Sequence, residues 1–164
     1  MIKHVGRLRL LVILVAGVAS LAITATALGA FLTKGTTRDA FASVDVSSPA
    51  TTSSSSFVNL PGMSVSVTIP AGKTADLFVT FNAELNGCGP INVRAIVDSS
   101  ATIAAPGAAL LFSHTGGSAE AHGFTWMRTA GAGTHSVTIQ WLSGGGCSQA
   151  FAGVRSLWVT ANVH

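Results

Sequence analysis

From Phe57 to the C-terminus, apolar and polar residues alternate with a period of two. Alternation of this kind is typical of strands that bury one face, and turn signals rich in Gly and Pro separate the runs about every ten residues. After residue 34 no segment has a convincing helical period. The pattern therefore predicts an antiparallel sandwich or barrel. The expected strands cover residues 57–60, 64–69, 77–84, 91–97, 108–112, 124–129, 136–141 and 157–163.

The first 33 residues have a different pattern, because Leu10 to Thr33 form a run of 24 residues without a charge after a basic start. As a helix this run reaches about 36 Å, enough to cross a hydrocarbon layer of about 30 Å. Two interpretations stay open: a secretory signal peptide cut near Ala27 or Ala30, or an uncleaved signal-anchor helix that holds residues 10–33 in the membrane. Both place the rest of the chain outside the cytoplasm, secreted or anchored on the extracytoplasmic face of the plasma membrane.

Residues 34–56 are rich in Ser and Thr and include the run Thr51-Thr52-Ser53-Ser54-Ser55-Ser56. Such a composition buries too little apolar surface to offset the entropy of ordering. We expect three regions: 1–33 as signal peptide or signal-anchor helix, 34–56 as linker, and 57–164 as the β-sandwich domain.

Charge is sparse in the expected domain, where four basic residues balance four acidic ones. A nucleic-acid reader needs clustered Lys and Arg to displace counterions, so nucleic acid is excluded as a partner. Low net charge weakens repulsion between copies and makes self-association easier.

The chain has two cysteines, Cys88 and Cys147, each in a Gly-rich stretch. An even number in an exported chain favours a disulfide. In the chain-entropy model, closing a loop of this length stabilises the fold by about 4 kcal/mol. The spacing fits neither a zinc site nor a redox pair. We predict a structural disulfide.

Three segments carry a resemblance to known proteins: Val67–Gly72, Gly133–Trp141 and Arg155–Val159. The chain resembles small exported bacterial β-sandwich proteins of unknown function and, more loosely, the jelly-roll heads of the tumour necrosis factor and complement-head superfamily. The resemblance spans residues 57–164 and implies a jelly roll that often trimerises. The chain departs from the complement heads in lacking a collagen Gly-x-y stalk and any Tyr. The expected fold is thus an all-β, antiparallel, jelly-roll-like sandwich of about eight strands preceded by one N-terminal apolar helix.

Trp158 is the leading candidate for a binding residue. If Leu157 and Val159 face the core, Trp158 faces outward, and the same rule turns Phe78 and Met127 outward. In a jelly roll the strands of these three residues share one sheet, and a contiguous exposed apolar patch marks an interface. Three interpretations remain: a contact between subunits of a dimer or trimer, a stacking platform for a sugar ring, or a surface simply covered by residues 57–60 or by a loop.

Metal sites have weak candidates. His114, Glu120 and His122 bracket one turn, but their spacing matches no standard zinc motif. The stretch Asp98-Ser99-Ser100 and Asp76 offer oxygen ligands for calcium without a clustered motif. His135 follows a Gly turn and is expected to cap it. No cofactor is predicted.

The usual parts of a catalytic site are absent from the sequence, which has no Gly-x-Ser-x-Gly elbow and no His-Glu-x-x-His. A hydrolase with an unrecognised site would need a pocket that holds at least two of His114, Glu120, His122 and Asp98. The leading expectation is a non-enzymatic, exported or surface-tethered β-sandwich that acts by self-association or by binding an extracellular protein. The alternative is a carbohydrate-binding module for wall or matrix glycans that uses exposed aromatics.

Overall fold

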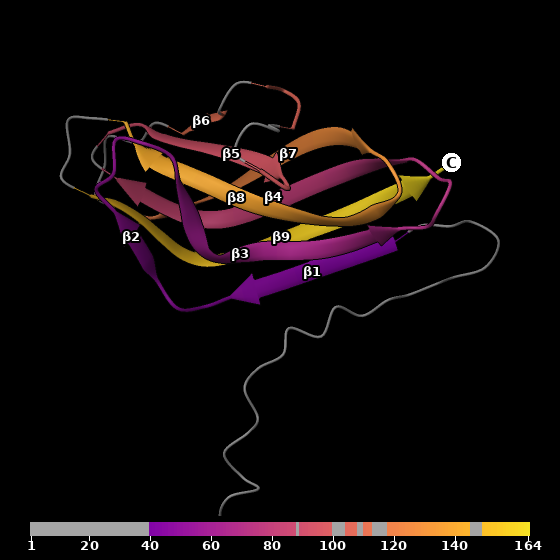
Figure 1. Ribbon diagram of the computed structural model, residues 1–164. Coiled ribbons are helices and arrows are strands. Elements are labelled where there is room, and N and C mark those ends of the chain that lie inside the picture. The colour runs from indigo at the N-terminus through magenta and orange to yellow at the C-terminus, as the bar shows by residue number, and fades with distance from the viewer. Residues whose placement is uncertain (1–39, 88, 100–103, 108–109, 113–117, 145–148) are drawn as a thin grey trace, which may run out of the picture.

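The computed structural model describes residues 40–87, 89–99, 104–107, 110–112, 118–144 and 149–164 as two antiparallel sheets that face each other (Figure 1). Within these ranges no helix is long and apolar enough to cross a membrane. The expected helix at residues 10–33 lies outside them and stays a prediction. The strands are β1 (Ala40–Val46), β2 (Ala50–Thr52), β3 (Val58–Ile69), β4 (Ala75–Gly87), β5 (Ile91–Val97), β6 (Leu110–Phe112), β7 (Glu120–Ala130), β8 (Gly133–Ser143) and β9 (Ala150–Val163).

One sheet has the order β1-β9-β4-β7, with β2 also paired to β9, and the other has the order β3-β8-β5-β6. The chain passes from one sheet to the other at six of the eight connections between consecutive strands, so most hydrogen-bonded neighbours are far apart in sequence. When β1 and β2 are taken together as one edge, each sheet is four strands wide. This is a jelly-roll-like sandwich, in agreement with the expected all-β class and close to the expected number of strands.

The period-two pattern is explained by burial. On β4 the residues Leu77, Val79 and Phe81 have no exposed surface, whereas Phe78 and Asn82, at alternate positions of the same strand, face solvent. Two of the three tryptophans, Trp126 and Trp141, fill the space between the sheets and are each 1% exposed. The stacked rings of Phe124 and Trp126, with centroids 5.8 Å apart, extend this core along β7.

The expected linker at residues 34–56 is wrong for its C-terminal part, because β1 and β2 lie there. All seven residues of β1 pair with β9, from Ala40 opposite Ala161 to Val46 opposite Arg155. Ala42 is buried and Val44 and Val46 pack on the core, while the residues between them face the other way. Because β9 supplies a full ladder of backbone partners, a short alternation inside a Ser-rich and Thr-rich segment is enough to form a strand. The folded domain begins by Ala40 and not at Phe57.

The expected strands at 57–60 and 64–69 merge into β3, whose pairing with β8 shifts between Asn59 and Ser64. The shift contains Gly62, which has a φ of +76°. A Cβ atom at this position would lie 2.8 Å from Cγ2 of Val46, so both the backbone conformation and the close approach of β1 require glycine. The bulge explains why the alternation in the sequence has a break.

Candidate functional site

The five-stranded sheet carries Phe78, Met127 and Trp158, the three candidate binding residues named from the sequence. Phe78 on β4 pairs directly with Met127 on β7, and Trp158 on β9 pairs with Thr80, so it lies diagonally across from Phe78. The exposed fractions are 41% for Phe78, 44% for Met127 and 50% for Trp158. All three therefore lie on the solvent-facing side of one sheet, as their alternation with buried residues indicates.

Phe41 on β1 extends this surface, and the sequence does not single it out because residues 34–56 have the composition of a linker. Its ring meets the ring of Trp158 edge to face, with centroids 5.7 Å apart and an interplanar angle of 83°. The signal that would have found it is the alternation of Phe41 with Ala42 and Val44. We call Phe41, Trp158, Phe78 and Met127 the apolar patch.

Short hydroxyl side chains occupy the positions between the members of the apolar patch. Thr160 lies between Phe41 and Phe78, and Thr80 lies between Trp158 and Thr125. No charged residue stands in these two cross-strand rows of described residues. Residues 57–60, one expected cover for Trp158, lie elsewhere: Phe57 packs with its ring centroid 4.0 Å from the guanidinium of Arg94, and β3 belongs to the other sheet.

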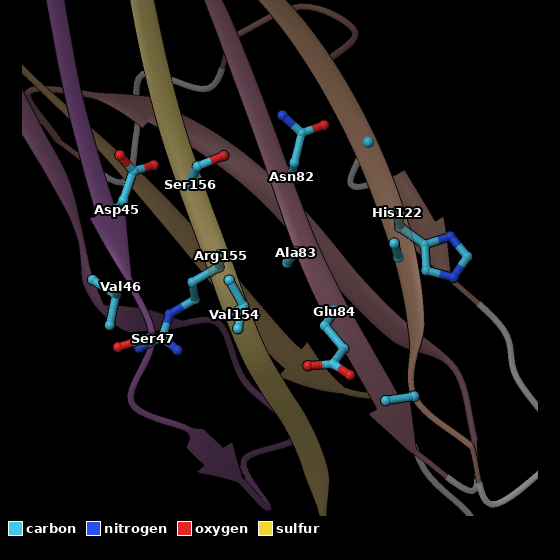
Figure 2. Close-up of a pocket in the computed structure, with 13 residues that line it drawn as sticks. Asp45, Val46, Ser47, Asn82, Ala83, Glu84, His122, Val154, Arg155 and Ser156 are labelled. Atoms are coloured by element: carbon cyan, nitrogen blue, oxygen red, sulfur yellow. The ribbon is translucent and has the colours of Figure 1, made fainter.

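A groove of about 930 Å³ lies on the same sheet (Figure 2). Its lining residue Ser156 is two positions from Trp158 of the apolar patch on β9. Asp45, Ser156 and Asn82 line it from three adjacent strands, and Gly123 continues their row on β7. Beyond this row the pairing of β4 with β9 shifts between Ala83 and Leu85. The groove is lined by Asp45, Val46, Ser47, Asn82, Ala83, Glu84, Ala119, Ala121, His122, Gly123, Val154, Arg155 and Ser156.

Arg155 is a charged side chain that the fold buries, with 3% of its surface exposed. Its Nη1 donates to the carbonyl oxygens of Ser48 at 2.7 Å and Gly153 at 2.9 Å, and its Nη2 donates to the carbonyl oxygen of Pro61 at 2.8 Å. Desolvation lowers the pKa of Arg155. The guanidinium thereby ties the turn after β1 and the bulge of β3 to β9, which is a structural role.

His122 and Glu120, two of the three weak metal candidates, lie near each other on β7, with 3.5 Å between His122 Nε2 and Glu120 Oε2. His114, the third, lies outside the described residues. Within the described ranges no group of three His, Cys, Asp or Glu side chains is placed to hold a metal ion. Of the four residues named for a hydrolase, His122 appears in the lining of the groove.

Asp98 and Asp76, the weak calcium candidates, lie on different sheets and already accept hydrogen bonds. Asp98 accepts from the Ser136 backbone N–H at 2.9 Å and contacts His135 Nδ1 at 2.9 Å. Asp76 accepts from the Thr129 hydroxyl at 2.7 Å. Among the described residues, neither carboxylate belongs to a group of three side chains placed to hold a metal ion.

His135 has the expected turn-capping role. Its Nε2 lies 2.9 Å from the carbonyl oxygen of Gly131 in the β7–β8 turn. The hydrogen bond with Asp98 raises the pKa of His135, and this effect outweighs desolvation, which lowers it. Desolvation alone raises the pKa of Asp98, but the hydrogen bonds with His135 and Ser136 and the charge of His135 together lower it.

Cys88 and Cys147 lie outside the described residues, and their disulfide stays a prediction. Their neighbours in the sequence are brought together at one end of the sandwich: Gly87 pairs with Ala150, and Ile91 pairs with Ser143. The Gly144 N–H also donates to the carbonyl oxygen of Pro90 at 2.6 Å. This adjacency favours the predicted bond.

Comparison with known proteins identifies no family. No family model matches the chain, and no curated protein matches it. Distant similarity to solved β-sandwich structures is found. The structure of infectious bursal disease virus Gx strain has a TM-score of 0.42 and 10% identity over 76% of this chain and 33% of that chain. Dimeric latent PorU from Porphyromonas gingivalis has a TM-score of 0.42 and 10% identity over 82% of this chain and 12% of that chain. The globular domain of zebrafish complement 1qA protein has a TM-score of 0.39 and 13% identity over 73% of this chain and 94% of that chain.

The chain spans about a third of the length of the first of these structures and about an eighth of the second. At these identities and TM-scores the similarities are distant and carry no argument about the role of this chain. The chain is an all-β sandwich of two antiparallel sheets with a distant likeness to the complement 1q globular domain.

Proposed function

We propose that this β-sandwich is a non-enzymatic binding module that associates with a second copy of itself through the apolar patch. The observation that carries the proposal is the exposure of Trp158, Phe78 and Met127 on one face, each at 41% to 50%. Covering large exposed apolar side chains with a complementary surface removes them from water, which lowers the free energy of the associated state. A patch that meets its own symmetry mate is self-complementary, which is the usual geometry of a dimer.

The charge distribution supports a second copy as the partner. Residues 40–164 contain Asp45 in addition to the four acids of the expected domain, against the same four basic residues, so the net charge is close to zero. The rows that hold the apolar patch contain Thr and Ser between the apolar side chains and no charged residue. Two such faces approach without electrostatic repulsion, and their hydroxyls can exchange hydrogen bonds at the rim.

We also propose that the domain works outside the cytoplasm, secreted or anchored on the extracytoplasmic face of the plasma membrane. The support is the uncharged run Leu10–Thr33 behind a basic start. Sequencing of the N-terminus of the protein purified from its host distinguishes the cleaved form from the anchored form. Recovery of the uncleaved protein in the soluble cytoplasmic fraction would contradict export.

Self-association is tested by light scattering after size exclusion, with the full chain in detergent at a series of concentrations. The wild-type mass is expected to rise with concentration, whereas Trp158→Ser and Met127→Ser should remain at the mass of one copy. Val58→Ser is the matched control, because Val58 is also exposed but lies on β3 in the other sheet. All variants keep residues 1–39 unchanged, so a difference between them reports on the sandwich. A wild-type mass that is independent of concentration and equal to one copy would contradict the proposal.

A further inference from the structure

The groove on the five-stranded sheet has a floor of short hydrogen-bonding groups in register. Asp45 pairs with Ser156, Ser156 pairs with Asn82, and Asn82 pairs with Gly123, so a single row crosses four strands. Asp45 and Asn82 are exposed and Ser156 is half-buried. Together these side chains offer a carboxylate, a hydroxyl and an amide, which both donate and accept hydrogen bonds. Figure 2 shows the three side by side on adjacent strands.

Two glycines make the room for this groove. A Cβ atom at Gly123 would lie 2.9 Å from Oδ1 of Asn82, and a Cβ atom at Gly153 would collide with the carboxylate of Glu84. Glycine weakens a strand, and its presence in a strand interior often marks the close approach of another group. Here the missing side chains let Asn82 and Glu84 lie over the neighbouring strands, which keeps the surface above them open.

The charges around the groove favour a neutral polar ligand. The carboxylates of Asp45 and Glu84 line it, and the positive charge of Arg155 lies in its wall with its η nitrogens bound to carbonyl oxygens. Among the described residues that line the groove, the basic ones are Arg155, whose η nitrogens are bound, and His122, which lies 3.5 Å from the Glu120 carboxylate. An anionic ligand would therefore meet the carboxylates of Asp45 and Glu84 with little positive charge to balance them. Sites for phosphate or for acidic chains need the opposite arrangement.

From these features we infer that the groove binds a neutral saccharide chain. Hydroxyl groups of a sugar match the mixed donors and acceptors of Asp45, Ser156 and Asn82. Trp158 is two residues from Ser156 on β9, which corresponds to about 7 Å along the strand. One pyranose ring packed on the exposed indole would therefore place the next ring over Ser156 and Asn82. This site goes beyond the proposed self-association, because its polar contacts come from residues outside the apolar patch.

The test titrates the full chain, in a detergent without a sugar headgroup, with neutral oligosaccharides of glucose, xylose, mannose, galactose and N-acetylglucosamine. Binding is followed by calorimetry and by the NMR signal of the Asn82 side-chain amide. We expect saturable binding of at least one oligosaccharide and about tenfold weaker binding by Asn82→Ala and Ser156→Ala, the effect of losing one good hydrogen bond. Asn162→Ala is the matched control, because Asn162 is an exposed asparagine on the outer face at the other end of β9.

Failure of the whole panel to bind would overturn the inference, and so would equal affinity of Asn82→Ala and Asn162→Ala. Tighter binding of an oligogalacturonate than of every neutral sugar would contradict the charge argument. These outcomes are separate from the proposed self-association, because Asn82→Ala and Ser156→Ala leave the apolar patch intact. Their masses, measured without sugar, are therefore expected to follow the wild type.

Discussion

The Nδ1 atom of His135 lies 2.9 Å from Oδ2 of Asp98, while its Nε2 atom lies 2.9 Å from the carbonyl oxygen of Gly131. A carboxylate and a carbonyl are both acceptors, so both hydrogen bonds form only when both ring nitrogens carry a proton. The imidazolium form of His135 is therefore the form that this contact stabilises. The contact joins the end of β5 to the β7–β8 turn.

This pair predicts a pH-dependent contribution to stability. The raised pKa of His135 means that its contribution is fully present below about pH 6.5 and is lost as the pH rises through the folded-state pKa. The lowered pKa of Asp98 means that its contribution is present above about pH 4 and is lost as the pH falls through the folded-state pKa. The two together stabilise most between about pH 4 and 6.5.

We expect His135→Ala to lower the free energy of unfolding by about 0.5–1 kcal/mol at pH 5.5, since Asp98 is half-exposed and screened by solvent. The loss should shrink at pH 9, where the wild type has also lost the charged contact. Urea unfolding at both pH values measures it, with His164→Ala at the C-terminus as control. An equal loss for His135→Ala at both pH values would show that the charge does not matter.

Arg155→Lys is expected to destabilise the fold by about 2–4 kcal/mol, because one ammonium cannot reach the carbonyl oxygens of Ser48, Gly153 and Pro61 together. Without the guanidinium, some of these buried carbonyl oxygens have no hydrogen-bond donor. Urea unfolding measures the change, and Lys73→Arg in the β3–β4 turn is the control for exchanging the two cations. If Arg155→Lys is as stable as the wild type, the hydrogen bonds of the guanidinium do not contribute to stability and the side chain acts by packing alone.

Removal of residues 1–46 should destabilise the sandwich far more than removal of residues 1–39. The longer deletion removes β1, which pairs with β9, and takes Ala42 and its apolar neighbours out of the core. The backbone of β9 on that side then has no partner strand at residues 155–161. We expect a loss of about 3 kcal/mol or more, with aggregation at high concentration. Thermal unfolding of the two fragments beside the full chain tests this. Equal melting temperatures would mean that β1 adds little to the domain.

Quenching of tryptophan fluorescence by iodide should reach one of the three tryptophans in dilute protein, since Trp158 is 50% exposed while Trp126 and Trp141 are each 1% exposed. Trp158→Phe should abolish the quenchable fraction. If copies associate through the apolar patch, quenching of the wild type should fall as protein concentration rises. Quenching that does not change with concentration, in a protein whose mass rises, would place the interface elsewhere.

If Cys88 and Cys147 form the predicted disulfide, we expect reduction to lower the free energy of unfolding by about 4 kcal/mol. Mass spectrometry of peptides from the unreduced protein should identify the linked pair. Cys88→Ser is the matched variant, because it removes the bond without a reducing agent and should lose the same stability. Two free thiols in protein purified from its host would contradict both the bond and the proposed oxidising location.

The sequence alone predicts the all-β class of the fold and the residues that face solvent on one sheet. Alternation is a local property, so the period of Leu77, Val79 and Phe81 predicted a half-buried strand without knowledge of its neighbours, and the same rule turned Phe78, Met127 and Trp158 to the solvent. The tertiary structure decided everything that depends on which distant segments meet. Residues 40–46 became a strand because β9 lies beside them, and Phe41 joined Trp158 for the same reason. The saccharide groove, the burial of Arg155 and the contact of His135 with Asp98 each combine segments far apart in the chain, and no local pattern records such pairings.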